Sequence, residues 1–230
     1  PNCQLEVRAA RPGQPEAPYY LGESAVGLAM QASIEGRDPR ALYAEAIARM
    51  SEAIALDPDR VGMLVGRGSA RYRKGEAEAI RGGDAAAEHE QAVADFDKAL
   101  SIDPKEMTAR LNRGNARLVW GVALRATGGD PRRLYAQALE DFDALLSADS
   151  EDSFALSNRG LVWQRLGECE AAAGGSPIAS YERSILDYEA ATSLDDTDAA
   201  MRNNLGNAWL RKGVSELARG GDAEASMGRA

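Results

Sequence analysis

The sequence is poor in the residues from which metal centres and disulfide frameworks are built. It contains one histidine, His89, and two cysteines, Cys3 and Cys169, which lie far apart and form no CxxC motif. A disulfide framework and a zinc-finger site are therefore excluded. His89 is not followed by a second histidine four residues later, which excludes the zinc-protease motif. We expect neither a metal nor a cofactor.

Basic residues are also scarce relative to acidic ones. The 230 residues include 27 Lys and Arg against 36 Asp and Glu, which gives a formal net charge of −9. A nucleic-acid binder normally presents a basic stripe to the phosphates, and anionic membranes attract basic segments. The charge balance therefore disfavours both nucleic acid and membrane as partners.

Long apolar runs are missing as well. The longest one, residues 118–124, is far shorter than the roughly 20 residues that cross a bilayer. No cationic segment followed by an apolar one is recognisable at the start of the chain. We therefore expect a cytoplasmic location. The chain starts at Pro1 in the middle of a repeat, as described below, so we expect it to be a fragment of a longer protein.

What the sequence does contain is a segment that recurs every 46 residues. Residues 92–104 read AVADFDKALSIDP, and similar text stands at 46–58, 138–149 and 184–195. The aspartates near the ends of these segments give the period, because 103 − 57, 149 − 103 and 195 − 149 all equal 46. A fixed period of this size is typical of a stacked-repeat solenoid.

Each repeat contains two stretches with helical patterns. The second stretch has apolar residues at helical spacing, as in Val93, Phe96 and Leu100, and we interpret its other face, with Asp95 and Asp97, as solvated. The first stretch carries a glycine in one register, which indicates close helix packing. These glycines are Gly22, Gly68, Gly114, Gly160 and Gly206. Between the two stretches stands a joint such as Gly36-Arg-Asp-Pro39, which predicts a helix stop followed by a restart.

The pattern of small and bulky positions resembles the tetratricopeptide repeat family, whose repeat has Leu-Gly, then a large residue, then Ala-x3-Phe, then Pro. The matching positions are Leu21-Gly22, Leu205-Gly206, Trp163, Trp209, Ala92-x3-Phe96, Ala138-x3-Phe142, Pro58 and Pro104. The resemblance implies an all-α fold, a right-handed α-solenoid of antiparallel helix pairs. Trp163 and Trp209 then fit helix-pair packing better than an aromatic recognition box.

The repeat is longer than that of the family, which has 34 residues. Gly68 and Ala92 are 24 residues apart, and the excess of 12 straddles the Gly-Gly-Asp joint. Both helices should therefore be lengthened at the joint end, with a first helix from near Asp59 to Arg81 that runs about 33 Å.

These repeats predict one continuous solenoid domain. Its parts are a preceding tail at 1–14, repeats at 15–58, 59–104, 105–150 and 151–196, and the first helix of a fifth repeat at 197–230. We expect no second helix to cover that last one. Its apolar residues Leu205, Trp209, Leu210 and Val214 would then be exposed or covered by sequence or a molecule beyond this chain.

Convergent groups for catalysis are scarce. His89 shares its register with Tyr43, Tyr135 and Tyr181, which predicts a half-buried position rather than a catalytic one. The aspartates in the register of Asp95 are interpreted as solvated. No phosphate-binding loop of the GxxxxGK[ST] type is present. We therefore expect no enzymatic activity.

Binding is better supported. In the family that this chain resembles, the first helices line a concave groove, and an asparagine two residues before the marker glycine contributes to ligand binding. That asparagine is present at Asn112, Asn158 and Asn204, with further polar residues one and two turns along the same face. These are Asn115, Asn207, Arg73, Arg165 and Arg211.

Asparagine can hold a peptide amide through both its donor and its acceptor, and arginine can bind an acidic group. The alternative is that these asparagines bond a neighbouring helix or face water. The sequence thus predicts a non-catalytic scaffold that binds a protein or peptide partner in its groove. A second hypothesis is a self-association or regulatory module of a larger protein, which stacks end to end through its end helices.

Overall fold

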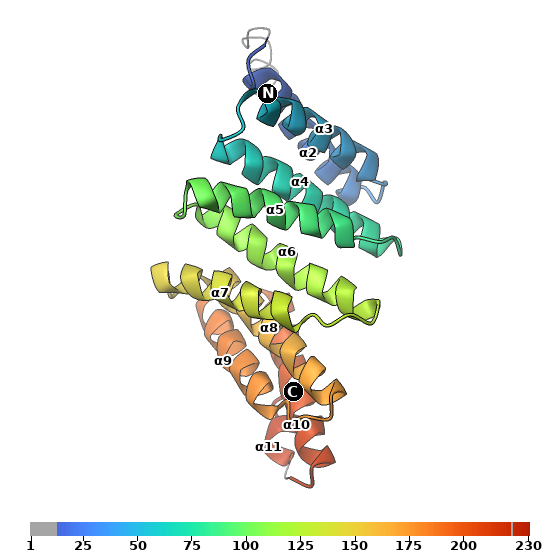
Figure 1. Cartoon of the computed structure of the whole chain (residues 1–230). Helices are drawn as coiled ribbons and strands as arrows, with labels where there is room; N and C mark the ends of the chain where they lie inside the picture. Colours follow the sequence, from blue (N-terminus) through green and yellow to red (C-terminus); the bar gives the residue numbers. More distant parts are fainter. Residues whose placement is uncertain (1–12, 222) are drawn as a thin grey trace. The chain divides into compact units, whose positions relative to one another are not determined.

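The structure is a computed structural model, and it describes residues 13–221 and 223–230. Within that part of the chain every regular element is a helix (Figure 1). None of these helices is long and apolar enough to cross a membrane. Cys3 and most of the expected tail at 1–14 lie outside the described residues.

Longer and shorter helices alternate along the chain from α2 to α10. The first helices of the repeats are α2 (Glu16–Ile34), α4 (Val61–Ile80), α6 (Met107–Ala126), α8 (Ser153–Ala172) and α10 (Ala199–Ala218). The second helices are α3 (Arg40–Leu56), α5 (Ala86–Ile102), α7 (Arg132–Ala148) and α9 (Ile178–Leu194). Helix α4 spans 20 residues and α5 spans 17, so α4 runs about 30 Å, close to the length expected from sequence.

The helix boundaries follow the sequence period. Successive first helices from α4 onward begin 46 residues apart, since 107 − 61, 153 − 107 and 199 − 153 are equal. The second helices α3, α5, α7 and α9 also begin 46 residues apart. Both helices expected in each of the four repeats are therefore present in the chain.

The chain divides into two compact units, Pro1–Gly129 and Asp130–Ala230. In the first unit α2 to α6 pack consecutively, and the first helices α2, α4 and α6 also contact one another in that order. In the second unit α7 to α11 (Glu224–Met227) pack consecutively, and α8 contacts α10. The boundary falls between the two helices of the repeat expected at 105–150. The single solenoid domain therefore stays a prediction.

The joints turn as the sequence indicates. In the joint after α4, Gly82 has a φ of +73°, a conformation that favours glycine. The backbone N–H of Gly83 donates to the Glu78 carbonyl at 2.9 Å and that of Gly82 donates to the Ala79 carbonyl at 3.0 Å, which closes the helix. Asp84 Oδ1 then accepts a hydrogen bond from the Ala86 N–H at 2.9 Å and starts α5.

The marker glycines bring the paired helices together. A Cβ at Gly68 would lie 2.7 Å from Phe96 Cε1, so the phenyl ring of the second helix occupies the space above the glycine of the first. Seven residues on, a Cβ at Gly75 would lie 2.5 Å from His89 Cε1. The close approach that the sequence indicates is therefore present at both positions in this pair.

Helix α10, the first helix of the fifth repeat, is covered more than expected. The four-residue helix α11 packs on α10, at the place where a second helix would begin, and Met227 Cγ lies 2.9 Å from the position of a Cβ at Gly213. The prediction that no second helix covers α10 is thus wrong for its C-terminal half. Leu210 and Val214 remain exposed, whereas Leu205 and Trp209 are half-buried.

Candidate functional site

The predicted binding residues lie on the first helices, and the structure describes them as two sets. Asn112, Asn115 and Arg73 belong to α6 and α4 in the first unit. The second unit holds the rest, on α8 and α10: Asn158, Arg165, Asn204, Asn207 and Arg211. Each set is placed on adjacent helices, because α4 contacts α6 and α8 contacts α10.

Asn112 makes a contact between two first helices. Its Nδ2 donates a hydrogen bond to Ser69 Oγ of α4 at 3.0 Å. This matches the alternative interpretation, in which the asparagine bonds a neighbouring helix. Its carbonyl oxygen could still accept a bond from a ligand. Asn115, three residues on, is half-buried and makes no side-chain hydrogen bond with any described residue.

The asparagines of the second unit differ from Asn112. Asn158 and Asn204 are half-buried and Asn207 is exposed. Within residues 13–221 and 223–230 none of their side chains makes a hydrogen bond. Asn112 bonds the hydroxyl of Ser69, which lies 43 residues before it on the preceding first helix. The residue 43 positions before Asn204 is Leu161, which has no hydroxyl group to accept such a bond. The amides of Asn158 and Asn204 can therefore form hydrogen bonds with a ligand.

Two of the three predicted arginines are engaged with a buried carboxylate. Arg165 Nη1 lies 3.0 Å from Glu168 Oε1, and Arg211 Nη2 lies 3.2 Å from the same oxygen. The Glu168 side chain is only 10% exposed. Arg165 and Glu168 both belong to α8, so Arg211 alone of these two arginines connects α10 to α8 through Glu168. Arg73, by contrast, is exposed and forms no ion pair or hydrogen bond with any described residue.

The aspartates in the register of Asp95 were interpreted as solvated, and this interpretation was wrong, whereas Asp97 is exposed as expected. Asp95, Asp141 and Asp187 are 4%, 1% and 6% exposed. Asp187 accepts hydrogen bonds from Arg159 Nε and Nη2 at 2.9 and 2.6 Å, and Arg159 Nη1 also contacts Asp143 Oδ1 at 2.8 Å. The hydrogen bond with Asp187 raises the pKa of the Arg159 guanidinium, whereas burial raises the pKa of the Asp187 carboxyl group.

The physical reason for this correction, at Asp95 and Asp187, is that each of these aspartates stands between the two helices of a pair. Asp95 stands on the side of α5 that carries Ala92 and Ala99, both fully buried against the first helices. Arg67, next to Gly68, and Arg159, next to Gly160, reach across to Asp95 and Asp187 of the paired helix. A bidentate arginine compensates the loss of water around such a buried charge.

His89 is buried rather than half-buried. It is 2% exposed, and its ring lies 6.0 Å from the Tyr72 ring and against Gly75. Burial lowers the pKa of His89 to about 4, so the imidazole is neutral near pH 7. The three tyrosines in the same register, Tyr43, Tyr135 and Tyr181, are buried as well. His89 thus fills a packing position. Among the described residues no group of three or more His, Cys, Asp or Glu could hold a metal ion.

The two tryptophans pack against side chains of neighbouring helices. Trp163 is half-buried, with the Arg183 guanidinium of α9 4.5 Å from its ring centroid. Trp209 packs beside Ile185 and Tyr188, with the Arg229 guanidinium 5.0 Å from its ring. Cation–π contacts of this kind cover the outer face of each indole. These contacts agree with the packing interpretation.

No family model and no curated protein matches the sequence. Solved structures do resemble the fold. BtubC (BKLC) from P. vanneervenii is 20% identical with a TM-score of 0.58, over 99% of this chain and 86% of that one. A MamA RS-1 ArsTM double mutant is 18% identical with a TM-score of 0.56, over 90% and 92% of the two chains. A tetratricopeptide repeat protein from Parabacteroides merdae ATCC 43184 is 16% identical with a TM-score of 0.50, over 90% and 74%. The chain therefore has the tetratricopeptide-repeat fold, an all-α solenoid of helix pairs.

Proposed function

We propose that this protein is a non-catalytic interaction scaffold that binds an extended peptide of a partner protein on the face formed by its first helices. The observation that supports this function most directly is the pair Asn158 and Asn204, which present unbonded amides on two helices in contact. An amide side chain can bind a peptide group through its N–H and its carbonyl at once, whatever the side chain of that peptide residue is. The rigid helices fix the spacing of the two amides.

Affinity capture from a lysate of the source organism tests this function. The bait is the whole chain, compared with the double variant Asn158→Ala/Asn204→Ala after circular dichroism has shown equal helix content. Gln91→Ala is the matched control, because Gln91 is an exposed amide on the second helix α5. We expect a protein that the wild type and the control retain and that the double variant loses. Equal retention by all three would contradict the role of the first-helix face.

Asn112 is tested separately because its role differs. Since its amide bonds Ser69, we expect Asn112→Ala to lower stability slightly as well as affinity. A variant that lowers stability alone would limit the ligand site to the second unit. The cytoplasmic location expected from sequence stays a prediction.

A second candidate function is self-association through the last helix. Leu210, Val214 and Leu217 are spaced by four and three residues on α10 and are all exposed, although α11 covers another face of that helix. A second copy of the chain could cover this stripe. Light scattering over a range of concentrations checks it: self-association predicts a mass that rises with concentration in the wild type and not in Leu210→Glu. A monomer at all concentrations would rule it out.

A further inference from the structure

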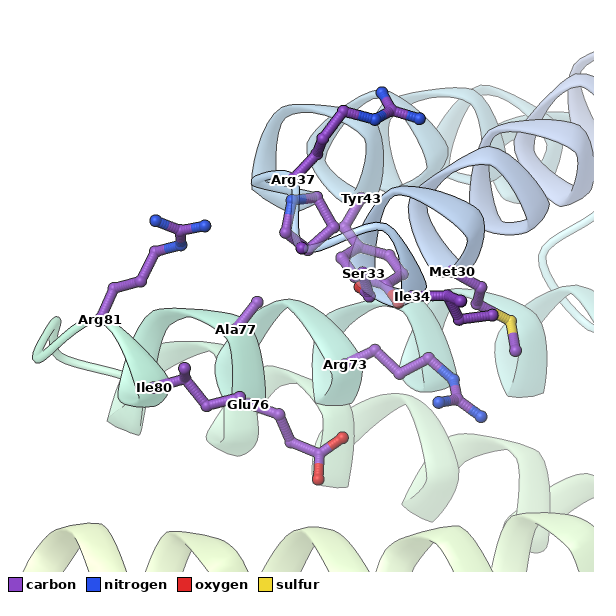
Figure 2. A pocket seen from close by; sticks show the side chains of 12 residues that line it. Met30, Ser33, Ile34, Arg37, Tyr43, Arg73, Glu76, Ala77, Ile80 and Arg81 are labelled. Carbon is purple, nitrogen blue, oxygen red and sulfur yellow. The ribbon is translucent and has the colours of Figure 1, made fainter.

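The first unit contains a pocket where the lengthened ends of α2 and α4 face each other. It has a volume of about 490 Å³, which is within the roughly 300–1,000 Å³ of small-molecule sites. Figure 2 shows Met30, Ser33 and Ile34 of α2 on one side and Arg73, Ala77 and Ile80 of α4 on the other. The α2–α3 turn contributes further lining residues. We call this site the α2–α4 pocket.

The pocket continues the predicted binding face. Positions 66, 69 and 73 of α4 correspond in the repeat to the predicted groove residues Asn112, Asn115 and Arg165. Positions 77 and 80 lie further along the same face of α4, four and seven residues after Arg73. Residues 73–81 also lie between Gly68 and Ala92, the interval that holds the 12 extra residues of the repeat. The lengthening therefore supplies much of the α4 wall of this pocket.

The apolar part of the pocket is highly exposed, and the corresponding ends of the later first helices lack its large side chains. Ile34 and Ile80 are 79% and 85% exposed. They stand in one register, because 80 − 34 = 46, and each is the last residue of its helix. The next first helices end in alanine at that register, at Ala126, Ala172 and Ala218. Two large exposed isoleucines on neighbouring helices thus mark one local surface rather than a property of every repeat.

The charged part of the pocket favours an acidic ligand. Three arginines and one glutamate line it, in a chain whose net charge is −9. Glu76 accepts a hydrogen bond from the Tyr72 hydroxyl at 3.0 Å, Arg37 donates to Glu35 at 2.8 Å, and Arg81 lies 3.6 Å from Asp38. Arg73 alone among these four has no ion pair or hydrogen bond with a described residue.

We propose that the α2–α4 pocket binds a peptide segment in which an aspartate or glutamate side chain pairs with Arg73 while a nearby large apolar side chain rests on Ile34 and Ile80. A guanidinium holds a side-chain carboxylate through two parallel hydrogen bonds. Arg73 and Ile80 are seven residues apart on one helix, about 10 Å along its axis. An extended peptide rises about 3.3 Å per residue, so the acidic and apolar residues should be about three positions apart. This inference rests on the proposed function in its general form, peptide binding on the first-helix face.

A phage-displayed library of random dodecapeptides, selected on the immobilised whole chain, tests the proposal. We expect enriched peptides that share an acidic residue about three positions from a large apolar one. Calorimetry with a synthetic enriched peptide should then show binding about tenfold weaker for Arg73→Ala, the loss of one charged hydrogen-bonded pair. Replacing the acidic residue of the peptide by its amide should weaken binding by a similar factor, and combining both changes should add little.

Two more variants sharpen the result. Ile80→Ala should weaken binding about fivefold by removing apolar contact area. Arg49→Ala is the matched control, because Arg49 is an arginine on α3 whose side chain is 41% exposed and does not line the pocket, and it should leave affinity within twofold. Arg73 and Ile80 are exposed and Arg49 is half-buried, so circular dichroism should be unchanged in all three variants. The proposal is overturned if no peptide family is enriched, if the family lacks an acidic residue, or if Arg73→Ala binds as the wild type does.

The same peptide separates this inference from the proposed function. Asn158→Ala/Asn204→Ala changes only the second unit and should leave binding of a pocket peptide intact. A partner lost by the asparagine variant but retained by Arg73→Ala and Ile80→Ala would leave the proposed function standing and contradict the pocket. A peptide that depends on Arg73 but not on the asparagines would support the pocket alone.

Discussion

The Arg67 guanidinium on α4 closes on the Asp95 carboxylate on α5, with Nη2 2.6 Å from Oδ1 and Nε 3.0 Å from Oδ2. Arg71, one turn along α4, adds a third contact of 2.6 Å from its Nη1 to Oδ2. The Asp95 side chain is 5% exposed, and both arginines are largely covered. One buried carboxylate therefore holds two cations of the partner helix and fixes the register of this helix pair.

Replacing Asp95 by asparagine should destabilise the protein strongly. The change leaves two mostly buried guanidinium groups without their counter-charge, and breaking a buried pair in this way typically costs about 3–5 kcal/mol. Urea unfolding followed by circular dichroism measures the free energy of unfolding. Glu52→Gln is the control, because Glu52 is exposed and lies 3.5 Å from Arg49, a geometry worth about 0–1 kcal/mol. Similar losses in both variants would show that Asp95 is not a structural centre.

The helices and the turns could be predicted from sequence because they depend on local rules. Glycine after a helix, aspartate at the next start and apolar residues at helical spacing each act within a few residues along the chain. The same rules locate α4 to within two residues at its start and one at its end. The joint between α4 and α5 confirms the local expectation in detail.

Each buried ion pair joins an arginine of one helix to an aspartate of the next. The pattern of polar and apolar residues within a single helix therefore does not predict it. A signal was nevertheless present in the sequence. Arginine recurs at 67, 113 and 159 as aspartate recurs at 95, 141 and 187, and in the first repeat both are replaced together, by Leu21 and Arg49. Because the arginine and the aspartate are both absent from the same repeat, the sequence indicates that the residues at these two positions interact. The α2–α4 pocket, in contrast, depends on how far two helix ends stand apart, which no residue pattern specifies.

Gly75→Ala should be destabilising through a clash with His89. The new Cβ would lie 2.5 Å from Cε1 and 2.8 Å from Nδ1 of the imidazole, a rigid ring that is buried against α4. Overpacking of this kind costs about 1–3 kcal/mol. Thermal unfolding of Gly75→Ala, His89→Ala and the double variant measures the coupling. The double variant should be more stable than the sum of the two single losses predicts.

The matched control for this clash is Gly27→Ala. Gly27 lies inside α2 with no atom within 4 Å of the new Cβ. Alanine is favoured over glycine in a helix by about 0.5–1 kcal/mol, so this variant should be more stable than the wild type. A stabilising effect at Gly75 would contradict the close packing of α4 on α5.

His89 should make the stability depend on pH between about 6.5 and 4. Its pKa is lowered to about 4 in the folded protein by burial, against an ordinary value of 6.5. The unfolded chain therefore binds a proton first as the pH falls, and the free energy of unfolding decreases by at most about 3 kcal/mol over this window. Above pH 6.5 the imidazole is neutral in both states and the effect vanishes.

His89→Tyr isolates the contribution of this one group. Tyrosine occupies the same register in three other repeats, and Tyr181 packs on Gly167 as His89 packs on Gly75, so the substitution should fit. Carboxylates titrate in both proteins, so the measured quantity is the difference between their unfolding free energies at each pH. That difference should change in favour of the variant as the pH falls from 7 to 4. A constant difference would show that His89 is as accessible to protons as in the unfolded chain.

Arg165 and Arg211 allow the structural and ligand-binding roles of the first-helix face to be separated. Both contact Glu168, whose side chain is 10% exposed, whereas the arginines themselves are 32% and 44% exposed. Removing one arginine still leaves the other beside the carboxylate, so Arg165→Ala or Arg211→Ala should each cost no more than about 1 kcal/mol. Glu168→Ala should cost more, about 1–3 kcal/mol, because the half-buried Arg165 loses its partner. Chemical unfolding of the three variants checks this order. If both arginine variants instead keep full stability while a captured partner is lost, the two arginines belong to the ligand site rather than to the contact between α8 and α10.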